Sequence, residues 1–169
     1  MSELITDEYK RLNSELHESN STYGTSGWKW APHVEKLSKE YQTQNILDYG
    51  CGKRTLQQNL SFDIDHYDPA IPEFSERPVQ HDIVVCTDVL EHIEPDCLND
   101  VLTDLHDLAK KVVFLTVATR PACKTLADGR NAHLIVENSD WWIDKLKEKF
   151  KILNKFGSTR EFTIIGVPL

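Results

Sequence analysis

The stretch that decides the fold is Ile46-Leu47-Asp48-Tyr49-Gly50-Cys51-Gly52. The apolar run from Asn45 to Asp48 predicts a short buried strand. The glycines that follow predict a sharp turn, and they allow the backbone to approach a ligand where a Cβ would clash. In an open α/β sheet, ligands bind outside the carboxyl ends of the strands. We therefore expect the turn after this strand to be a ligand-binding loop.

Strands and helices alternate on both sides of this turn. Strands are expected over residues 62–67, 82–87, 111–117, 151–156 and 161–167, and helices over 5–17, 28–41, 53–60 and 95–110 and from Ser139 onward. The alternation predicts a mostly parallel sheet with helices on both faces. The last two strands are joined by a turn at Gly157-Ser158, too short for a crossover helix, so they must pair antiparallel. The expected fold class is α/β, a Rossmann-like doubly wound sheet with an antiparallel last strand.

The length of 169 residues predicts one domain, 1–169, with an N-terminal helical or lid segment over 1–42 and a Rossmann-like core over 43–169. No apolar run approaches the roughly 18 residues of a membrane span, and the acidic N-terminus does not resemble a secretory signal. Four scattered cysteines fit free thiols in the cytoplasm. The net charge of −8 disfavours nucleic acid as a partner, and the lysines near the C-terminus are interpreted as a solvated helix face.

Two acids indicate which ligand the turn binds. Asp48 lies two places before Gly50, where a carboxylate would repel the pyrophosphate of a dinucleotide. The same carboxylate suits the amino group and sulfonium of S-adenosylmethionine (SAM). Asp68 follows about twenty residues later, where a carboxylate accepts hydrogen bonds from both ribose hydroxyls. Asp68 also suits the start of an Asp-Pro turn, and the two roles are compatible.

A third segment strengthens this interpretation. The strand expected at 82–87 runs into Asp88-Val89-Leu90-Glu91-His92. Together with the first two segments it resembles the class I SAM-dependent methyltransferases over roughly residues 44–117, in particular small members common in bacteria and phages. The segment from Asp128 to His133 and the pair Trp141-Trp142 add a less specific likeness. The resemblance implies the fold, SAM as cofactor and methyl transfer as the reaction.

The resemblance also implies roles for individual residues. The SAM loop would comprise Asp48, Tyr49, Gly50, Cys51 and Gly52. Asp68 and Pro69 would lie at the ribose, Asp88 and Val89 beside the methionine portion, and His92 near the cofactor at the start of the next helix. The chain departs from the pattern in two ways: Arg54 stands where a third glycine is common, and the third strand must be short or missing. Gln80 or His81 would then contact adenine.

Methyl transfer from a sulfonium needs alignment of donor and acceptor, and a hydroxyl or amine acceptor also needs a base. His133 is the candidate base, with a surface loop histidine as the alternative, and Asn131 and Arg130 are candidates to orient the acceptor. Tyr23 and Trp30 belong to an aromatic segment that is either a lid contacting substrate or a structural cluster. No metal site is expected, because no second His or Cys follows His92 at i+4 or at finger spacing. A purely packing role for the pair Glu91-His92 also remains open.

The acceptor class and three other functions remain open. A small molecule or a sugar is the expected acceptor, and a monomer or homodimer the expected state. A SAM-binding module without catalysis is the main alternative. The chain has no Asn-Pro-Pro-Tyr signature, which disfavours nucleic-acid base methylation. A nicotinamide dehydrogenase is disfavoured by Asp48, by Thr55 at the third GxGxxG position and by the closing hairpin.

Overall fold

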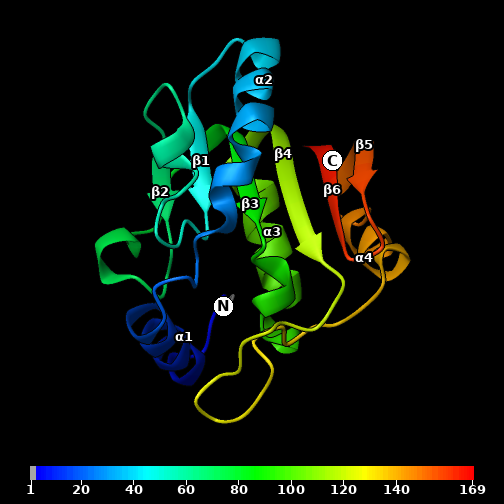
Figure 1. Ribbon diagram of the computed structural model, residues 1–169. Helices are drawn as coiled ribbons and strands as arrows, with labels where there is room; N and C mark the ends of the chain where they lie inside the picture. Colours follow the sequence, from blue (N-terminus) through cyan, green and yellow to red (C-terminus); the bar gives the residue numbers. More distant parts are fainter. Residues whose placement is uncertain (1–2) are drawn as a thin grey trace.

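The strands of the protein form one six-stranded sheet in the order β2-β1-β3-β4-β6-β5 (Figure 1). The computed structural model describes residues 3–169. The strands are β1 (Ile46–Tyr49), β2 (Asp65–Tyr67), β3 (His81–Thr87), β4 (Ala109–Ala118), β5 (Phe150–Gly157) and β6 (Glu161–Pro168). The α-helices are α1 (Asp7–Ser19), α2 (Ala31–Tyr41), α3 (Leu98–Leu108) and α4 (Ser139–Leu146).

The pairing of the strands confirms the predicted fold class. β1 pairs parallel with β2 and β3, and β3 pairs parallel with β4. β6 pairs antiparallel with both β4 and β5. The hairpin between β5 and β6 turns at Gly157, whose φ of 127° favours glycine, and the amide of Ser158 donates to the carbonyl of Glu161 at 2.8 Å.

Helices cover both faces of the sheet because successive residues of a strand point to opposite faces. Val34 and Leu37 of α2 pack against Ile83 and Phe114 on one face. The other face carries the larger core, in which α3 and α4 cover the strands. Trp142 of α4 is fully buried there. None of the helices in residues 3–169 combines the length and apolar character that a bilayer span requires.

The segment after β2 contains no strand, and the helix expected after β1 is shorter than predicted. Residues 68–80 form no strand, so β2 is an edge of the sheet, as the short spacing in the sequence predicts. The helix expected at 53–60 is only a 3-10 turn at Gln57–Asn59. Arg54 has a left-handed φ of 59°, which an α-helix cannot contain, and this explains the late start. The N-cap of α4 is Asn138, not Ser139, because the Asn138 side chain accepts from the amide of Trp141.

The carboxyl ends of the parallel strands all lie at one end of the molecule. β4 points toward this end in Figure 1, and α1 lies across it. The loop that follows β4, coloured yellow, runs beneath the same end before it reaches α4. Segments from the N-terminus and from the middle of the chain therefore meet where the strands end.

Candidate functional site

A cavity of about 310 Å³ lies at the carboxyl ends of the parallel strands. This volume is at the lower end of the roughly 300–1,000 Å³ typical of small-molecule sites. Eleven of the expected cofactor and catalytic residues line it, and Tyr23, an expected substrate contact, lines it as well. The eleven are Asp48, Tyr49, Gly50, Cys51, Gly52, Asp68, Pro69, Asp88, Val89, His92 and His133. The sequence-predicted cofactor residues are thus brought together around one cavity.

The glycine loop turns sharply, with φ of 79° at Gly50 and 52° at Gly52. The space that a Cβ would occupy at these two positions is filled by the protein itself. A Cβ on Gly50 would lie 2.3 Å from Cγ2 of Val89, and one on Gly52 would lie 2.6 Å from the carbonyl oxygen of Gly24. The sharp turn was correctly predicted. The close neighbours of these Cβ positions are, however, two other segments of the chain rather than open space for a ligand.

Two buried carboxyl groups flank this loop. Asp48 lies near the end of β1, and its buried carboxyl group has no hydrogen-bond partner within residues 3–169. Asp68 accepts hydrogen bonds from the amides of Gly52 at 3.1 Å and Ala70 at 3.0 Å. Burial, reinforced by Asp68, raises the pKa of Asp48 from 3.8 to about 7. Burial also raises the pKa of Asp68, against the opposing effect of its two amide donors. A cationic ligand group would stabilise the ionised form of Asp48.

The raised pKa of Asp48 predicts a pH-dependent gain in stability for Asp48→Asn. Because the folded-state pKa is above the unfolded value, the native side chain loses stability as the pH rises from about 4 to about 7. The amide carries no such penalty. The variant should therefore be more stable than the native protein by about 1–3 kcal/mol at pH 8 and closely matched at pH 4. Urea unfolding at the two pH values measures this, and an equal difference at both would contradict the assignment.

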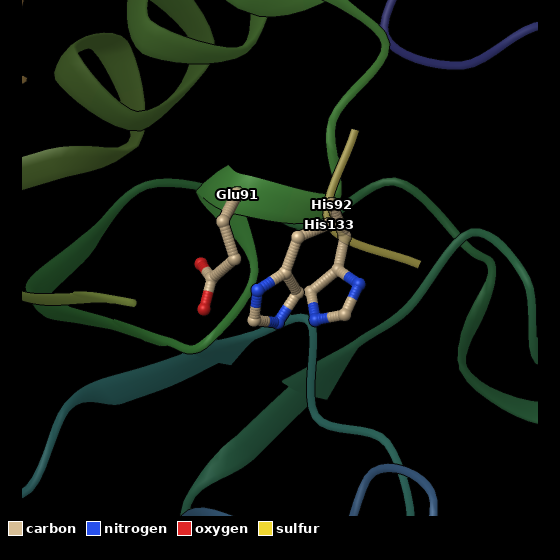
Figure 2. A group of neighbouring side chains, drawn as sticks. All are labelled: Glu91, His92 and His133. Carbon is tan, nitrogen blue, oxygen red and sulfur yellow. The ribbon is translucent and has the colours of Figure 1, made fainter. Parts of the chain in front are cut away.

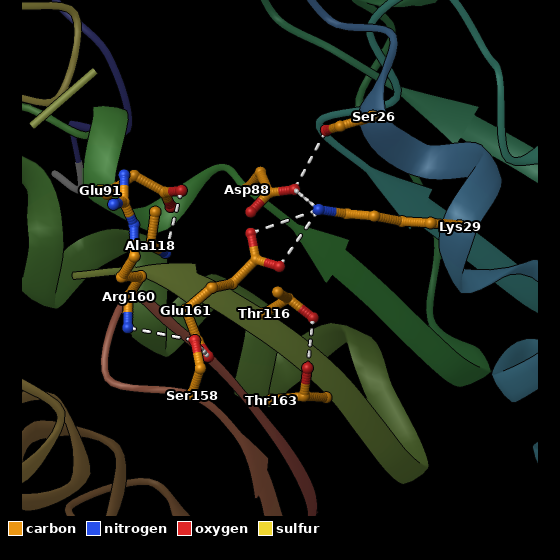
Figure 3. A network of polar contacts seen from close by, with 10 residues as sticks. All are labelled: Ser26, Lys29, Asp88, Glu91, Thr116, Ala118, Ser158, Arg160, Glu161 and Thr163. Carbon is orange, nitrogen blue, oxygen red and sulfur yellow. Dashed lines mark hydrogen bonds and ion pairs between the residues drawn. The ribbon is translucent and has the colours of Figure 1, made fainter. Parts of the chain in front are cut away.

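A polar network lies where β3 ends and β6 begins (Figure 3), and its members Ser26, Lys29, Asp88 and Glu161 line the cavity. Ser26 donates to Asp88 at 3.0 Å, and the ammonium of Lys29 lies 3.1 Å from Glu161 and 4.0 Å from Asp88. One carboxyl oxygen of Asp88, Oδ1, is buried without a partner. Burial and then the Glu161 carboxylate raise the pKa of Asp88 to about 7. The network attaches the 3-10 turn at Ser26–Trp30 to the sheet.

The segment of residues 20–27 covers the glycine loop. The side chain of Lys53 donates to the carbonyls of Asn20, at 2.9 Å, and Tyr23. The amide of Lys53 donates to the carbonyl of Gly24 at 3.0 Å. The ring of Tyr23 lies edge-on to His92, with centroids 5.8 Å apart. Residues 22–27 of this segment also line the cavity.

Three polar side chains converge on the cavity from the residues after β3 and from the β4–α4 loop (Figure 2). One ligand atom from each of Glu91, His92 and His133 lies within 4.8 Å of the others. Nδ1 of His92 donates to the carbonyl of Ala132 at 2.8 Å, and Nδ1 of His133 donates to the carbonyl of Arg120 at 2.5 Å. The two rings are edge-on, with centroids 4.7 Å apart.

Burial sets the protonation of this cluster. It lowers the pKa of His92 to about 3, with help from His133, and it also lowers the pKa of His133. Both rings are therefore neutral near pH 7. Glu91 is fully buried, and burial, then Asp88, raise its pKa well above the usual range. Glu91 was missed as a site residue, although an acid in the apolar run from Val89 to Ile93 was a signal.

Three expected substrate residues lie outside the cavity. Trp30 packs against Phe114 beneath α2, with centroids 5.8 Å apart, because its ring is the apolar partner of that face. Arg130 is paired with Asp128 at 2.7 Å on the exposed loop. Asn131 instead holds the loop together, since its amide side chain binds both the amide and the carbonyl of Ala122.

The two departures from the expected pattern are also resolved in space. The guanidinium of Arg54 lies over the ring of Phe74, 4.8 Å from its centroid, and does not line the cavity. His81 begins β3, at the end of the sheet opposite the cavity, and is held by Asp65 at 2.7 Å. Gln80 precedes it and donates to the carbonyl of Asp107. Neither residue is placed to contact adenine.

The comparisons with known proteins find matches to the structure of the chain and none to its sequence. No protein-family model and no curated protein matches the sequence. The N-methyltransferase NodS from Bradyrhizobium japonicum, solved with S-adenosylhomocysteine (SAH), superposes with a TM-score of 0.64 at 11% identity over 95% of this chain and 98% of its own. Magnesium protoporphyrin IX methyltransferase from Synechocystis, solved with SAM, gives 0.64 at 14% identity over 99% and 100%.

A third solved structure contains a methyl acceptor. It is the 1,6-didemethyltoxoflavin N1-methyltransferase from Burkholderia thailandensis, solved with 1,6-didemethyltoxoflavin and SAH. The TM-score is 0.62 at 12% identity over 99% of this chain and 93% of that one. These likenesses extend over almost the whole of both chains in each case.

Proposed function

We propose that this chain, which has the fold of the class I SAM-dependent methyltransferases, binds SAM in the cavity at the strand ends. It transfers the methyl group of SAM to a small-molecule acceptor. The observation that carries the proposal is the placement of three carboxyl groups at this cavity. Asp48, Asp68 and Asp88 all line it: Asp48 lies near the end of β1, and Asp68 and Asp88 directly follow β2 and β3. Three acids suit a ligand with an ammonium, a sulfonium and a ribose diol better than one with a pyrophosphate.

The residues present fit SAM in their chemistry. The Asp48 carboxyl group has no hydrogen-bond partner among the described residues and suits a cationic group, and Asp68 retains acceptor capacity for hydroxyl donors beyond its two amide bonds. SAM supplies a methyl group already activated on a sulfonium. The chain contributes alignment of the acceptor, exclusion of water by residues 20–27, and a neutral imidazole at His133 that can take a proton.

The acceptor is proposed to be a small molecule or a sugar. The cavity is small, and residues of α1 and of the β4–α4 loop are among those that line it. By their names, one solved relative acts on a compact heterocycle, 1,6-didemethyltoxoflavin, and another on a larger macrocycle, magnesium protoporphyrin IX. A SAM-binding protein without catalysis is the second candidate, but Arg54, the residue that favoured it, lies outside the cavity.

Calorimetric titration with SAM, SAH and NAD tests the cofactor. We expect SAM and SAH to bind with 1:1 stoichiometry and NAD not to bind. Binding of NAD without SAM would overturn the proposal. Mass spectrometry of small hydroxyl and amine compounds incubated with protein and SAM then separates an enzyme from a binding module. Only an enzyme yields a product heavier by one CH₂ group, about 14 mass units.

Substitution of Asp68 tests the ribose contact. Asp68→Ala should weaken SAM binding by about 1–3 kcal/mol, the loss typical of hydrogen bonds to a charged group. Asp68→Asn is the matched control, because its carbonyl still accepts from the amide of Gly52 or Ala70 and preserves the loop. An intermediate loss is expected for Asn. Unchanged affinity in both variants, measured by the same titration, would rule out the assignment.

A further inference from the structure

We propose that Glu91, His92 and His133 bind a divalent transition-metal ion at the wall of the cavity. Two imidazoles and one carboxylate are a donor set that suits Zn²⁺, Co²⁺, Mn²⁺ or Fe²⁺. His92 and His133 are 41 positions apart along the chain, so the fold and not a local motif brings them together. Ligand atoms within 4.8 Å of one another are close enough to share one ion after small side-chain adjustments.

The hydrogen bonds of the two histidines prepare them as ligands. Each ring donates Nδ1–H to a backbone carbonyl, that of Ala132 for His92 and that of Arg120 for His133. These bonds fix the tautomer and leave the lone pair on each Nε2. Neither Nε2 has a hydrogen-bond partner in the described chain. Metal-binding histidines almost always have such an outer partner, which orients the ring and raises its basicity.

Glu91 supplies the second, independent observation. Its side chain is fully buried, and Oε1 accepts from the amide of Ala118 at 3.1 Å. Its other oxygen, Oε2, is buried and has no hydrogen-bond partner in the part of the chain that the structure describes. Burial of a carboxylate with an unpartnered oxygen is costly unless a cation or a proton compensates it. An ion held by Glu91 and the two imidazoles, which lie near one another in Figure 2, would give Oε2 the partner that it lacks among residues 3–169.

The ion also indicates the acceptor class, an inference that rests on the proposed function. A divalent ion at this wall lowers the pKa of a hydroxyl that approaches it. The hydroxyl proton passes to water, the oxygen forms a bond to the methyl carbon, and the carbon–sulfur bond breaks to leave a neutral thioether. A compound with a hydroxyl, such as a phenol or a sugar, therefore fits better than an amine, which is already nucleophilic when neutral.

Cobalt titration of the metal-free, tag-free protein tests the site. We expect one equivalent of Co²⁺ to bind with a visible ligand-field spectrum. Glu91→Gln keeps a carbonyl for the amide of Ala118 but removes the charge, and His133→Phe keeps the ring packing but removes the nitrogen. Each should raise the Co²⁺ Kd at least about 10-fold, the lower bound seen even for outer-shell changes. His106→Gln, at an exposed histidine outside the cavity, is the matched control and should bind normally.

The outcomes distinguish the metal site from the cofactor proposal. Absence of stoichiometric Co²⁺ binding, or equal affinity in the native protein, Glu91→Gln and His133→Phe, would overturn the metal site. SAM titration of the same metal-free protein is a separate readout. SAM binding without Co²⁺ binding would leave the proposed cofactor intact and remove the ion, whereas the reverse would keep the ion and remove the cofactor. Thermal unfolding of each variant verifies that it is folded.

Discussion

Replacement of His133 by alanine is expected to lower kcat by about 100-fold or more, the usual contribution of a positioned acid–base group. The Kd for SAM should change by less than about 3-fold, because the ring contacts the wall formed by His92 and not the three carboxyl groups. The same result is expected whether His133 acts as a base or as a metal ligand, since both roles use its Nε2. The measurement is SAH production with an acceptor found by mass spectrometry.

A matched variant separates chemistry from packing at this position. His133→Phe preserves an aromatic ring beside His92 but lacks both ring nitrogens, Nε2 and the Nδ1 that donates to the carbonyl of Arg120. If the nitrogen matters, phenylalanine and alanine should lose turnover to a similar extent. Activity near the native level in His133→Phe would show that the ring only packs. Equal losses of turnover and SAM affinity in His133→Ala would count against a role in the transfer step.

Substitution of Gly50 by alanine should lower the free energy of unfolding by about 2–5 kcal/mol. Two effects add: a left-handed backbone costs about 1–2 kcal/mol for a residue with a Cβ, and overpacking costs about 1–3 kcal/mol. The φ of 79° produces the first, and the 2.3 Å approach of the new Cβ to Val89 produces the second. Urea unfolding measures the change, and SAM affinity should fall as well because the loop borders the cavity.

The chain offers a control that shares the backbone strain and lacks the clash. Gly129 has a φ of 89°, and a Cβ there would meet nothing within 4 Å. Gly129→Ala should therefore cost only about 1 kcal/mol. Adding Val89→Ala to Gly50→Ala should recover part of the lost stability, a coupling that a double-mutant cycle reports. If the two glycine variants were equally destabilised, the contact with Val89 would have no role.

Much of the fold could be predicted because its signals are local. β-Branched runs locate β3 and β4, and the short turn at Gly157 requires the closing hairpin. The errors arose where tertiary contacts decide local structure. Asp63 and Ile64 continue the alternation of β2 but have no partner strand, so the strand begins only at Asp65.

The acids that line the cavity could be predicted because they lie at or next to strand ends. Contacts that depend on long-range packing could not be predicted. Asp48, Asp68 and Asp88 each end or follow a strand, which a linear pattern reveals. The meeting of His92 with His133 depends on the path of a long loop, which no periodicity encodes. Trp30 and Asn131 were expected at the site for their chemistry. Trp30 instead packs in the core, and the Asn131 side chain accepts a hydrogen bond from the amide of Ala122 within the loop.

The contact between Gly24 and Gly52 has an evolutionary consequence. A Cβ on Gly24 would lie 3.2 Å from the Cα of Gly52, and one on Gly52 would lie 2.6 Å from the Gly24 carbonyl. Neither position can acquire a side chain unless the other segment moves away. Across related sequences the two glycines should therefore be retained together or replaced together. Lineages that lose one glycine should also show insertions, deletions or compensating changes around the other.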